Sequence, residues 1–476
     1  MPELTSNVLY YGDNLDVLRR HVADESVDLI YLDPPFNSNA TYNVLFGQAD
    51  GTKAAAQIKA FDDTWHWDHA AAEAFQEVVT HGEDVAQAMV AFRTLLGPST
   101  MLAYLSMMAP RLIELRRVLK PTGSIYLHCD PKASAHLRLL MDAIFGAKNF
   151  VNEIIWFYKT GGMSKRWFGR KHDVILFYAK GAKYKFTLQK EKSYLAHKYG
   201  FSNVTIEQDD DGFFTLVGMR DVWDIPALRG NQPEALGYPT QKPLAILERI
   251  IEASSSPGDV VLDPFCGCGT AVAASEKLGR KWIGIDIAYL AVSLIKSRLT
   301  TMGSSDYKIV GEPTTADDAA QLAEEDPYQF QWWALGLIGA RPQEGKKGAD
   351  KGVDGRLYFF DEGTDKAKQA IVSVKAGKVH VSHVRDLVGV LQREQAQIGI
   401  LISLNEPTGP MREEAAAAGF YSSPWGQHPT VQLLTVSELL SGKTIDMPAG
   451  GAHMTQVALP PAPEPTVHPD QLSLGA

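Results

Sequence analysis

The segment from Val260 to Asp286 constrains the fold of this chain more than any other. It reads as a buried strand, a glycine-containing loop over 266–269, a helix over 271–278 and a second strand that ends at Asp286. Two parallel strands need a long crossover, which a helix supplies. Glycines let a ligand approach the backbone closely, and the start of the following helix exposes free N–H groups. The segment predicts an α/β fold with a ligand site at the carboxyl ends of its strands.

A second motif, Asp33-Pro34-Pro35-Phe36, follows a buried strand expected over 27–32. The carboxylate only accepts hydrogen bonds, and each proline offers a carbonyl without an N–H group on a rigid backbone. Rigid acceptors beside an aromatic ring suit a planar heterocycle that carries an exocyclic amino group. Alone, the motif is also compatible with an ordinary turn at the end of a strand.

Asp286 stands 17 residues after Gly269, where an acidic side chain can accept hydrogen bonds from ribose hydroxyls. The chain lacks the G-x-G-x-x-G spacing of nicotinamide cofactor sites, and the loop carries no Walker A lysine. Cys266 and Cys268 have no second Cys/His pair to complete four metal ligands, so we interpret them as small loop residues.

Composition places the chain among globular proteins, with 45% hydrophobic and 21% charged residues, and the 476 residues predict two to four domains. Three cysteines indicate a reducing compartment. We find no signal peptide and no apolar run long enough for a membrane helix, so we expect a cytoplasmic, nucleoid-associated protein without membrane contact. The net charge is −10, yet residues 151–200 carry nine lysines and two arginines against three acidic residues. This basic, aromatic segment predicts a surface that faces phosphates.

The same patterns predict the domain organisation. We expect two α/β units separated by an acidic linker, and we interpret the proline-rich end of the chain as disordered. The predicted parts are one catalytic half over 1–150, a target-recognition region over 151–234, a cofactor-binding half over 235–302, the linker over 303–326, a further α/β unit over 327–446 and the tail over 447–476.

Together, the Asp33 motif and the loop from Asp263 to Gly269 resemble those of S-adenosylmethionine-dependent amino-group DNA methyltransferases. Tyr238-Pro-Thr-Gln-Lys-Pro243 is similar to a third block of that family, with Tyr in place of the usual His. The order of the three motifs matches the β subclass. The resemblance covers residues 7–302 and implies a permuted Rossmann-like methyltransferase sheet with an inserted target-recognition segment.

The resemblance also implies roles for individual residues. The catalytic set would be Asp33, Pro34, Pro35 and Phe36. The set that binds S-adenosylmethionine would be Asp13, Lys242, Pro243, Asp263, Phe265, Gly267, Gly269, Thr270 and Asp286. Asp13 and Lys242 can equally be a turn residue and a solvated charge. In the basic segment, Lys165, Arg166, Arg170 and Lys171 would contact DNA.

The implied reaction is methyl transfer to an amino group of a base flipped out of double-stranded DNA. Aspartate at the first motif position is associated with N6-adenine in the family, and N4-cytosine stays open. No Pro-Cys dipeptide is present, which argues against cytosine-C5 transfer. A DNA-binding regulator that has lost transfer is the alternative from another class. A homodimer and a cognate restriction enzyme are left open as partners.

The C-terminal unit carries Asp354 after a glycine turn and Lys375 at the end of a strand over 371–375. This pattern is similar to the Mrr-like branch of the restriction-endonuclease fold, which implies a metal role for Asp354 with Lys375 as its partner. Ser373 occupies a position that is acidic or an amide in the pattern, and one carboxylate fewer weakens Mg²⁺ binding. Three interpretations follow: an active Mg²⁺-dependent nuclease fused to the methyltransferase, a weakly catalytic DNA-binding relic, or an accessory domain.

Overall fold

The structure is a computed structural model. It describes residues 6–35, 67–80, 84–159, 166, 168–195, 205–229, 232–236, 238, 240–342, 352–359, 368–424 and 426–448. The described residues form two compact units, one over 6–228 and 240–311 and the other over 312–448 with residues 229–238. The predicted α/β class is confirmed in both units. None of the described helices is long and apolar enough to cross a bilayer.

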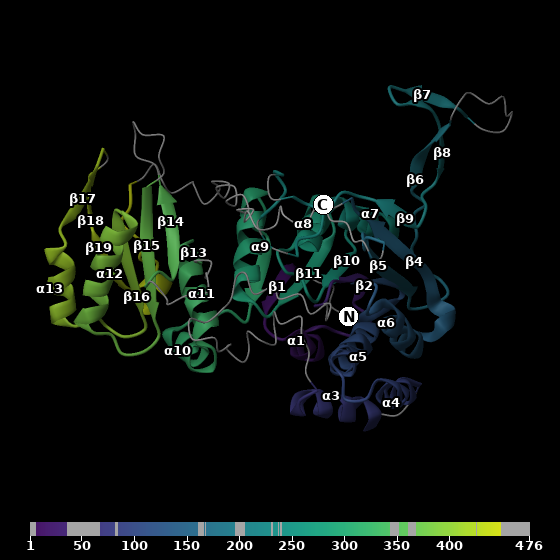
Figure 1. The fold of residues 1–476 in the computed structure, drawn as a ribbon, viewed down its shortest axis with the longest axis horizontal. Helices are drawn as coiled ribbons and strands as arrows, with labels where there is room; N and C mark the ends of the chain where they lie inside the picture. The colour runs from purple at the N-terminus through teal and green to yellow at the C-terminus, as the bar shows by residue number, and fades with distance from the viewer. Residues whose placement is uncertain are drawn as a thin grey trace, which may run out of the picture. The chain divides into compact units, whose positions relative to one another are not determined.

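A nine-stranded sheet forms the centre of the first unit (Figure 1). Its strands in spatial order are β12 (Tyr307–Val310), β1 (Asn7–Tyr11), β11 (Lys281–Asp286), β10 (Val260–Asp263), β2 (Val27–Leu32), β3 (Leu119–Cys129), β5 (His172–Ala179), β4 (Phe150–Phe157) and β9 (Val222–Asp224). All neighbours from β12 to β3 are parallel, whereas β5 is antiparallel to both β3 and β4. The late strands β10 and β11 lie between β1 and β2, so the two predicted halves build one sheet.

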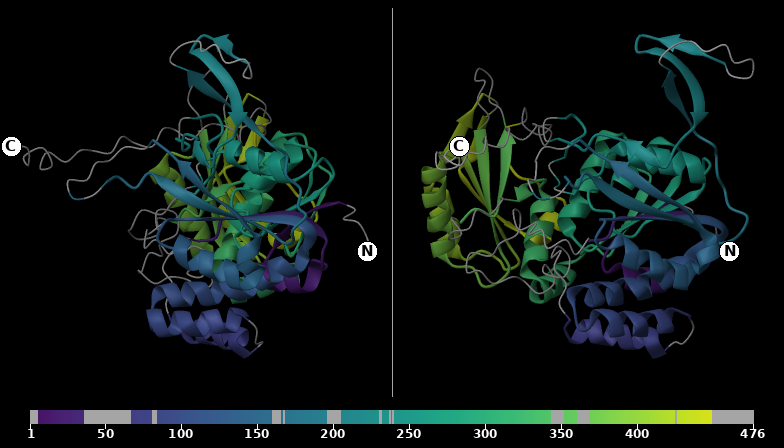
Figure 2. Two further views of the ribbon diagram at one scale, coloured as in Figure 1. Left: turned by 90° about the vertical axis from the view of Figure 1, so that its right-hand side faces the viewer. Right: turned by 45° about the vertical axis from the view of Figure 1, so that its right-hand side comes forward.

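Helices cover both faces of this sheet. One apolar cluster joins the sheet to α1 (Asn14–His21), α3 (His69–Thr80), α4 (Asp84–Leu96), α5 (Thr100–Val118) and α6 (Ser134–Met141). A second cluster joins the other face to α7 (Leu244–Ser254) and α8 (Thr270–Lys277). Side chains of β2 point alternately to the two faces of the sheet. Ile30 and Leu32 belong to the first cluster, and Leu29 and Tyr31 belong to the second. The remaining elements of this unit are η1 (Asp142–Gly146), η2 (Ala147–Asn149), α9 (Tyr289–Thr301) and a small antiparallel sheet of β6 (Lys190–Leu195), β8 (Gly212–Gly218) and β7 (Glu207–Asp209), which projects from the unit as an arm (Figure 2).

The second unit is built on a five-stranded sheet. Its spatial order is β13 (Arg341–Pro342), β14 (Gly355–Phe359), β15 (Lys368–Lys375), β16 (Ile398–Ser403) and β19 (Val431–Thr435). The pairs on either side of β14 are antiparallel and the last two pairs are parallel. An apolar cluster packs α12 (Val381–Glu394) and α13 (Gly409–Ala417) against this sheet. The unit also contains α10 (Ala316–Glu325), α11 (Pro327–Leu337), α14 (Val436–Leu440) and the hairpin of β17 (Phe420–Ser423) and β18 (Gly426–Pro429).

The predicted linker over 303–326 contains the boundary between the two units, which falls after Gly311, but it is not wholly irregular. Residues 307–310 form β12, which pairs with β1, and residues 316–325 form α10. Two of the acidic residues that suggested a linker, Asp317 and Asp318, lie in the first turn of α10, where their negative charge is favourable beside the positive end of the helix dipole. Asp318 also completes a capping box with Thr315. Ala319 and Ala323 are both buried and lie one helical turn apart, which is the apolar spacing that indicates a helix here.

The region 151–234 is not wholly an insertion, because β4, β5 and β9 belong to the large sheet. Their apolar residues pack in the core, as Ile154 and Ile175 do, so the excess of positive charge in this region concealed two core strands. The predicted disordered tail lies outside the described residues from 449 onward.

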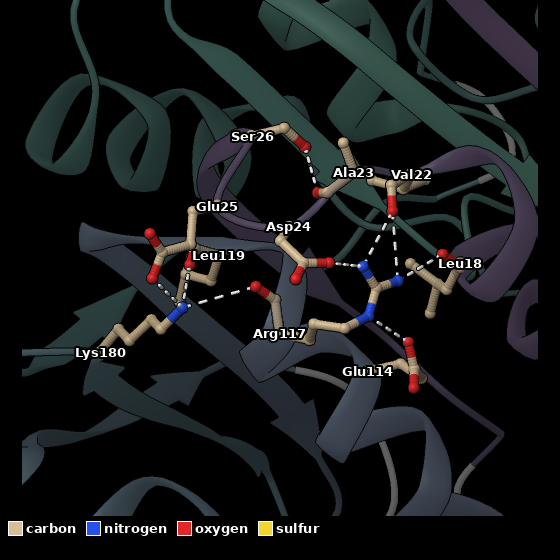
Figure 3. Close-up of polar contacts among 10 residues, drawn as sticks. All are labelled: Leu18, Val22, Ala23, Asp24, Glu25, Ser26, Glu114, Arg117, Leu119 and Lys180. Atoms are coloured by element: carbon tan, nitrogen blue, oxygen red, sulfur yellow. Dashed lines mark hydrogen bonds and ion pairs between the residues drawn. The ribbon is translucent and has the colours of Figure 1, made fainter. Parts of the chain in front are cut away.

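The guanidinium of Arg117, near the end of α5, donates hydrogen bonds to backbone carbonyls and acidic side chains (Figure 3). It donates to the carbonyls of Leu18 (2.7 Å) and Val22 (3.2 Å), which close α1, and to the carboxylates of Asp24 and Glu114. These bonds hold the turn between α1 and β2 against α5.

We expect Arg117→Ala to lower the free energy of unfolding of the first unit by about 2 kcal/mol, because hydrogen bonds from a charged donor are lost and partly buried carbonyls are left without partners. Chemical denaturation followed by tryptophan fluorescence measures this change. Arg116→Ala is the matched control, since Arg116 is the exposed neighbour on the same helix turn. Equal stability of the two variants would contradict this role.

Candidate active site at the carboxyl edge of the large sheet

Four aspartates follow or end four neighbouring parallel strands. Asp13 comes after β1, Asp286 ends β11, Asp263 ends β10 and Asp33 comes directly after β2. Because these strands are parallel, the four residues lie along one edge of the sheet. The register places Leu262 beside Ile30, which brings the two motifs of the sequence together.

The glycine loop between β10 and α8 is held by hydrogen bonds to the end of β11. The N–H of Gly267 donates to Oδ2 of Asp286 at 2.7 Å, and the N–H of Cys266 donates to the carbonyl of Ile285 at 3.1 Å. Gly269 has a φ of +74°, and a Cβ atom there would lie 2.6 Å from Cγ1 of Ile295. Glycine is therefore required at 269 both by the backbone conformation and by the close packing of α9.

Burial raises the pKa values of two carboxyl groups on this edge. Burial raises the pKa of Asp286 to about 6, against hydrogen bonds from the backbone of Ala288 and Gly267 that lower it. Burial also raises the pKa of Asp263 well above its usual range, and the charges of Asp33 and Asp286 add to this effect. The N–H of Phe265 donates to Oδ1 of Asp263 at 3.1 Å and partly offsets it.

Asp33 forms an ion pair with Lys242, whose side chain is 9% exposed. Only Oδ2 of Asp33 takes part in this pair. Oδ1 is buried and has no hydrogen-bond partner among the described residues. The carbonyl of Lys242 accepts from the hydroxyl of Thr270 at 3.3 Å, which links this lysine to the start of α8. The site therefore presents one carboxylate oxygen that is shielded from water and open to a donor.

The structure adds a buried polar network that the sequence reasoning missed. Nε2 of His128, at the end of β3, lies 3.2 Å from Oδ2 of Asp173, at the start of β5. Since a carboxylate only accepts, Nε2 of His128 donates to Asp173, and Nδ1 lies 2.9 Å from the hydroxyl of Tyr31. The hydroxyl of Tyr158 donates to the other oxygen of Asp173 at 3.1 Å.

The network has an electrostatic link to the ion pair. Burial raises the pKa of Asp173. The hydrogen bond and charge of His128, the charge of Lys242 and the hydrogen bond of Tyr158 lower this pKa, and together they bring it below its usual value. Burial, then the charges of Asp33 and other acidic groups, raise the pKa of Tyr31 well above its usual range. The sequence signal that could have revealed this network is His128, a polar residue near the end of a buried strand, as Asp33 is.

Asp13 has a clear structural role. Its side chain accepts from the N–H of Leu15 at 2.8 Å and so caps α1, and it pairs with Arg111 at 2.7 Å. Arg111 also donates to Asn14, whose amide donates to the carbonyl of Pro264 at 2.7 Å. Asp13 thereby connects the start of α1 to the loop that follows β10.

The predicted DNA-contacting residues are only partly described. Arg166 and Arg170 are exposed. Lys171, directly before β5, is half-buried, and its carbonyl accepts from the N–H of Tyr158 at 3.0 Å. Lys165 and the aromatic residue of the first motif, Phe36, lie outside the described residues. Pro34, Pro35 and Pro243 flank the ion pair of Asp33 with Lys242 in sequence.

Two families of known proteins match separate parts of this chain. Residues 27–297, more than half of the chain, match the model of the N6_N4_Mtase family, described as DNA methylase. The chain belongs to the DNA methylase family. Residues 322–441 match the model of the Mrr_cat family, described as restriction endonuclease.

Individual relatives agree with the family of this DNA methylase. It is 28% identical over 331 residues to the DNA adenine methyltransferase YhdJ of Escherichia coli, an alignment that covers 68% of this chain and 94% of that protein. It is 34% identical over 196 residues to the type II methyltransferase M.HpaI of Haemophilus parainfluenzae, covering 41% of this chain and 59% of that protein.

Solved structures resemble the DNA methylase at lower identity. A DNA modification methylase of Thermus thermophilus complexed with S-adenosyl-L-methionine is 17% identical, with a TM-score of 0.37, over 64% of this chain and 99% of that chain. The cytosine-N4-specific PvuII DNA methyltransferase is 16% identical, with a TM-score of 0.39, over 62% and 86% of the two chains.

The buried network of the DNA methylase generates a prediction. We expect His128→Leu to lower the free energy of unfolding of the first unit by about 2–4 kcal/mol, because the Tyr31 hydroxyl and the Asp173 carboxylate lose their buried partner. Denaturant titration measures the change.

His136→Leu is the matched control in the same unit. Nδ1 of His136 is buried without a partner among the described residues, so we expect a change within about 1 kcal/mol. Equal losses in the two variants would show that the network does not contribute beyond ordinary packing.

Proposed function

We propose that this DNA methylase transfers a methyl group from S-adenosylmethionine to the N6 amino group of an adenine flipped out of double-stranded DNA. The observation that carries the proposal is Oδ1 of Asp33, a buried acceptor without a hydrogen-bond partner among the described residues. An exocyclic amino group supplies the donor that this oxygen lacks.

The residues present fit S-adenosylmethionine, which supplies an electrophilic methyl group on a cationic sulfonium when bound. The edge carries four aspartates, of which Asp13 pairs with Arg111 and Asp33 pairs with Lys242. Asp286, with a pKa of about 6, is ionised at neutral pH, and its negative charge favours a cationic ligand. Asp286 would hold the ribose hydroxyls. The remainder of the cofactor set would be Asp13, Lys242, Pro243, Asp263, Phe265, Gly267, Gly269 and Thr270.

Asp33 and the carbonyl of Pro34 act on the target base. They accept from the two N–H bonds of the amino group, which favours a pyramidal nitrogen with its lone pair free to attack. As positive charge develops on that nitrogen, the carboxylate of Asp33 stabilises it and takes up the proton that is lost. Lys242 holds the other oxygen of Asp33 and so fixes which oxygen faces the base. No covalent enzyme intermediate is required.

Adenine is favoured over cytosine on two grounds. The first motif begins with aspartate, which the family resemblance associates with N6-adenine, and the E. coli relative is named a DNA adenine methyltransferase.

Nucleoside analysis of DNA after reaction with labelled S-adenosylmethionine tests this choice of base. N6-methyladenine is the expected product, N4-methylcytosine would overturn the base assignment, and bound cofactor without product would indicate a DNA-binding regulator. The cytoplasmic, nucleoid-associated location, the homodimer and the cognate restriction enzyme stay predictions.

We expect Asp33→Asn to lower the rate of transfer by about 10²-fold or more, because the amide cannot stabilise the developing positive charge as a carboxylate does. Affinity for S-adenosylmethionine, measured by calorimetry, should change by less than about threefold, well under 1 kcal/mol. Asp16→Asn, at an exposed carboxylate on α1, is the control and should leave both values unchanged. Loss of cofactor affinity in step with the rate would place Asp33 in the cofactor site instead.

The pKa of Asp286, raised by burial to about 6, predicts a pH dependence of cofactor binding. Asp286 is protonated below that pH and ionised above it, and the ionised carboxylate is the better acceptor for ribose hydroxyls. Affinity for S-adenosylmethionine should therefore rise between pH 5 and 7. Asp286→Asn should weaken binding about tenfold at pH 7.5 and abolish that rise. An identical pH profile in both proteins would contradict the assignment.

A further inference from the structure

The second unit contains a polar centre at one edge of its sheet, around Asp354. This residue directly precedes β14, and Lys375 ends the antiparallel neighbour β15, so both lie at the same edge. The N–H of Asp354 donates to the carbonyl of Val372 at 2.9 Å, which fixes its backbone to β15. Gln331 reaches the centre from α11 and Ser373 from β15.

Donors surround the carboxylate of Asp354. Oδ1 accepts from Nε2 of Gln331 at 3.1 Å. Oδ2 accepts from the N–H of Val374 at 2.6 Å and from the hydroxyl of Ser373 at 3.1 Å, and Nζ of Lys375 lies 3.7 Å away. The side chain of Asp354 is 9% exposed. Each oxygen of this carboxylate is therefore already hydrogen-bonded within the protein.

This arrangement does not fit the Mg²⁺ ion that a restriction-endonuclease fold implies. Mg²⁺ requires near-octahedral oxygen ligands and is held by carboxylates, and a nuclease uses the ion to activate water and stabilise the phosphate. The neighbours of Asp354 are an amide, a hydroxyl and a cation. Among the described residues, no group of three or more His, Cys, Asp or Glu side chains could hold a metal ion. The metal role expected for Asp354 is therefore not supported by its surroundings.

The surroundings of Lys375 instead favour an anion. Its side chain is 31% exposed, and Lys378 and His380 follow it as exposed residues. Burial, then the charges of Lys375 and His380, lower the pKa of His383, so these groups lie within electrostatic reach of one another. Asp386 on α12 offsets part of this effect. Asp354 balances Lys375, which leaves Lys378 as additional positive charge.

We propose that this centre binds a backbone phosphate of double-stranded DNA through Lys375, without a divalent metal ion, and that it does not cleave the strand. Asp354 is a positioning residue: it orients Lys375 and is itself held by Gln331 and Ser373. The inference rests on the proposed function only in that DNA is the substrate. A second contact on the same molecule raises the overall affinity, because the second binding event becomes intramolecular.

The first test measures DNA binding by the full chain as a function of salt. Lys375→Ala should weaken binding to duplex DNA about threefold to tenfold at physiological salt, and should lower the slope of log K against log[salt] by about 0.9, the value for one phosphate contact. Lys375→Arg should retain both values because it keeps the charge. Lys443→Ala is the control, since Lys443 lies on the same unit and pairs with Glu438.

Methyl transfer at saturating DNA keeps the two proposals distinguishable. It should be unchanged in Lys375→Ala, whereas failure of the proposed function would show as absent transfer in the parent chain. An unchanged salt slope in Lys375→Ala would overturn the phosphate contact.

The second test concerns the metal and uses Mn²⁺, whose binding is visible by electron paramagnetic resonance. The parent chain should leave Mn²⁺ free at millimolar concentration and should leave supercoiled plasmid intact with Mg²⁺ or Mn²⁺. Gln331→Glu, a change that keeps the size of the side chain, places a second carboxylate against Asp354 and should raise Mn²⁺ affinity at least about tenfold. Metal-dependent nicking by the parent that Asp354→Asn abolishes would overturn the proposal, as would an absence of Mn²⁺ binding in Gln331→Glu.

Discussion

Parallel pairing of β10 with β2 is the interaction on which the rest of the first unit depends. It joins segments far apart in sequence, and a buried carboxylate fixes it at the start of both strands: Asp28 accepts from the N–H of Val260, 232 residues away, at 3.1 Å and from Lys120 at 2.6 Å. Neighbouring strands lie about 4.8 Å apart. Once the strands start in register, their carboxyl ends bring Asp33 and Asp263 together without any direct bond between them.

The same pairing creates an electrostatic cost that the site uses. Four aspartates along one edge repel one another, and burial removes the water that would screen them. Burial raises the pKa values of both Asp263 and Asp286, and the charges of Asp33 and Asp286 raise that of Asp263 further. Lys242 offsets part of it, but only at one oxygen of Asp33. In the proposed reaction, the Asp286 carboxylate that is ionised at neutral pH makes a cationic cofactor a favourable partner for this edge.

The sequence predicted the elements of this edge better than their surroundings. The strands that end at Leu32, Asp263 and Asp286 were predictable because each is a short apolar run followed by glycine, proline or aspartate. The network of His128 and Asp173 was not, since it depends on β5 running antiparallel to β3, a pairing no local pattern specifies. Composition alone did not predict the helix α10 within 303–326, because acidic residues are as typical of a helix start as of a linker.

The two units apply one principle with opposite results. In each, residues from neighbouring strands converge on one edge of a sheet, and the balance of donors and acceptors there decides which ligand fits. At the first edge, Oδ1 of Asp33 is a buried acceptor without a partner among the described residues. At the second, donors surround the single carboxylate of Asp354, and Lys375 and Lys378 supply positive charge. An edge rich in acceptors favours a donor or a cation, and an edge rich in donors favours a phosphate, so the fold family alone does not determine the chemistry of either unit.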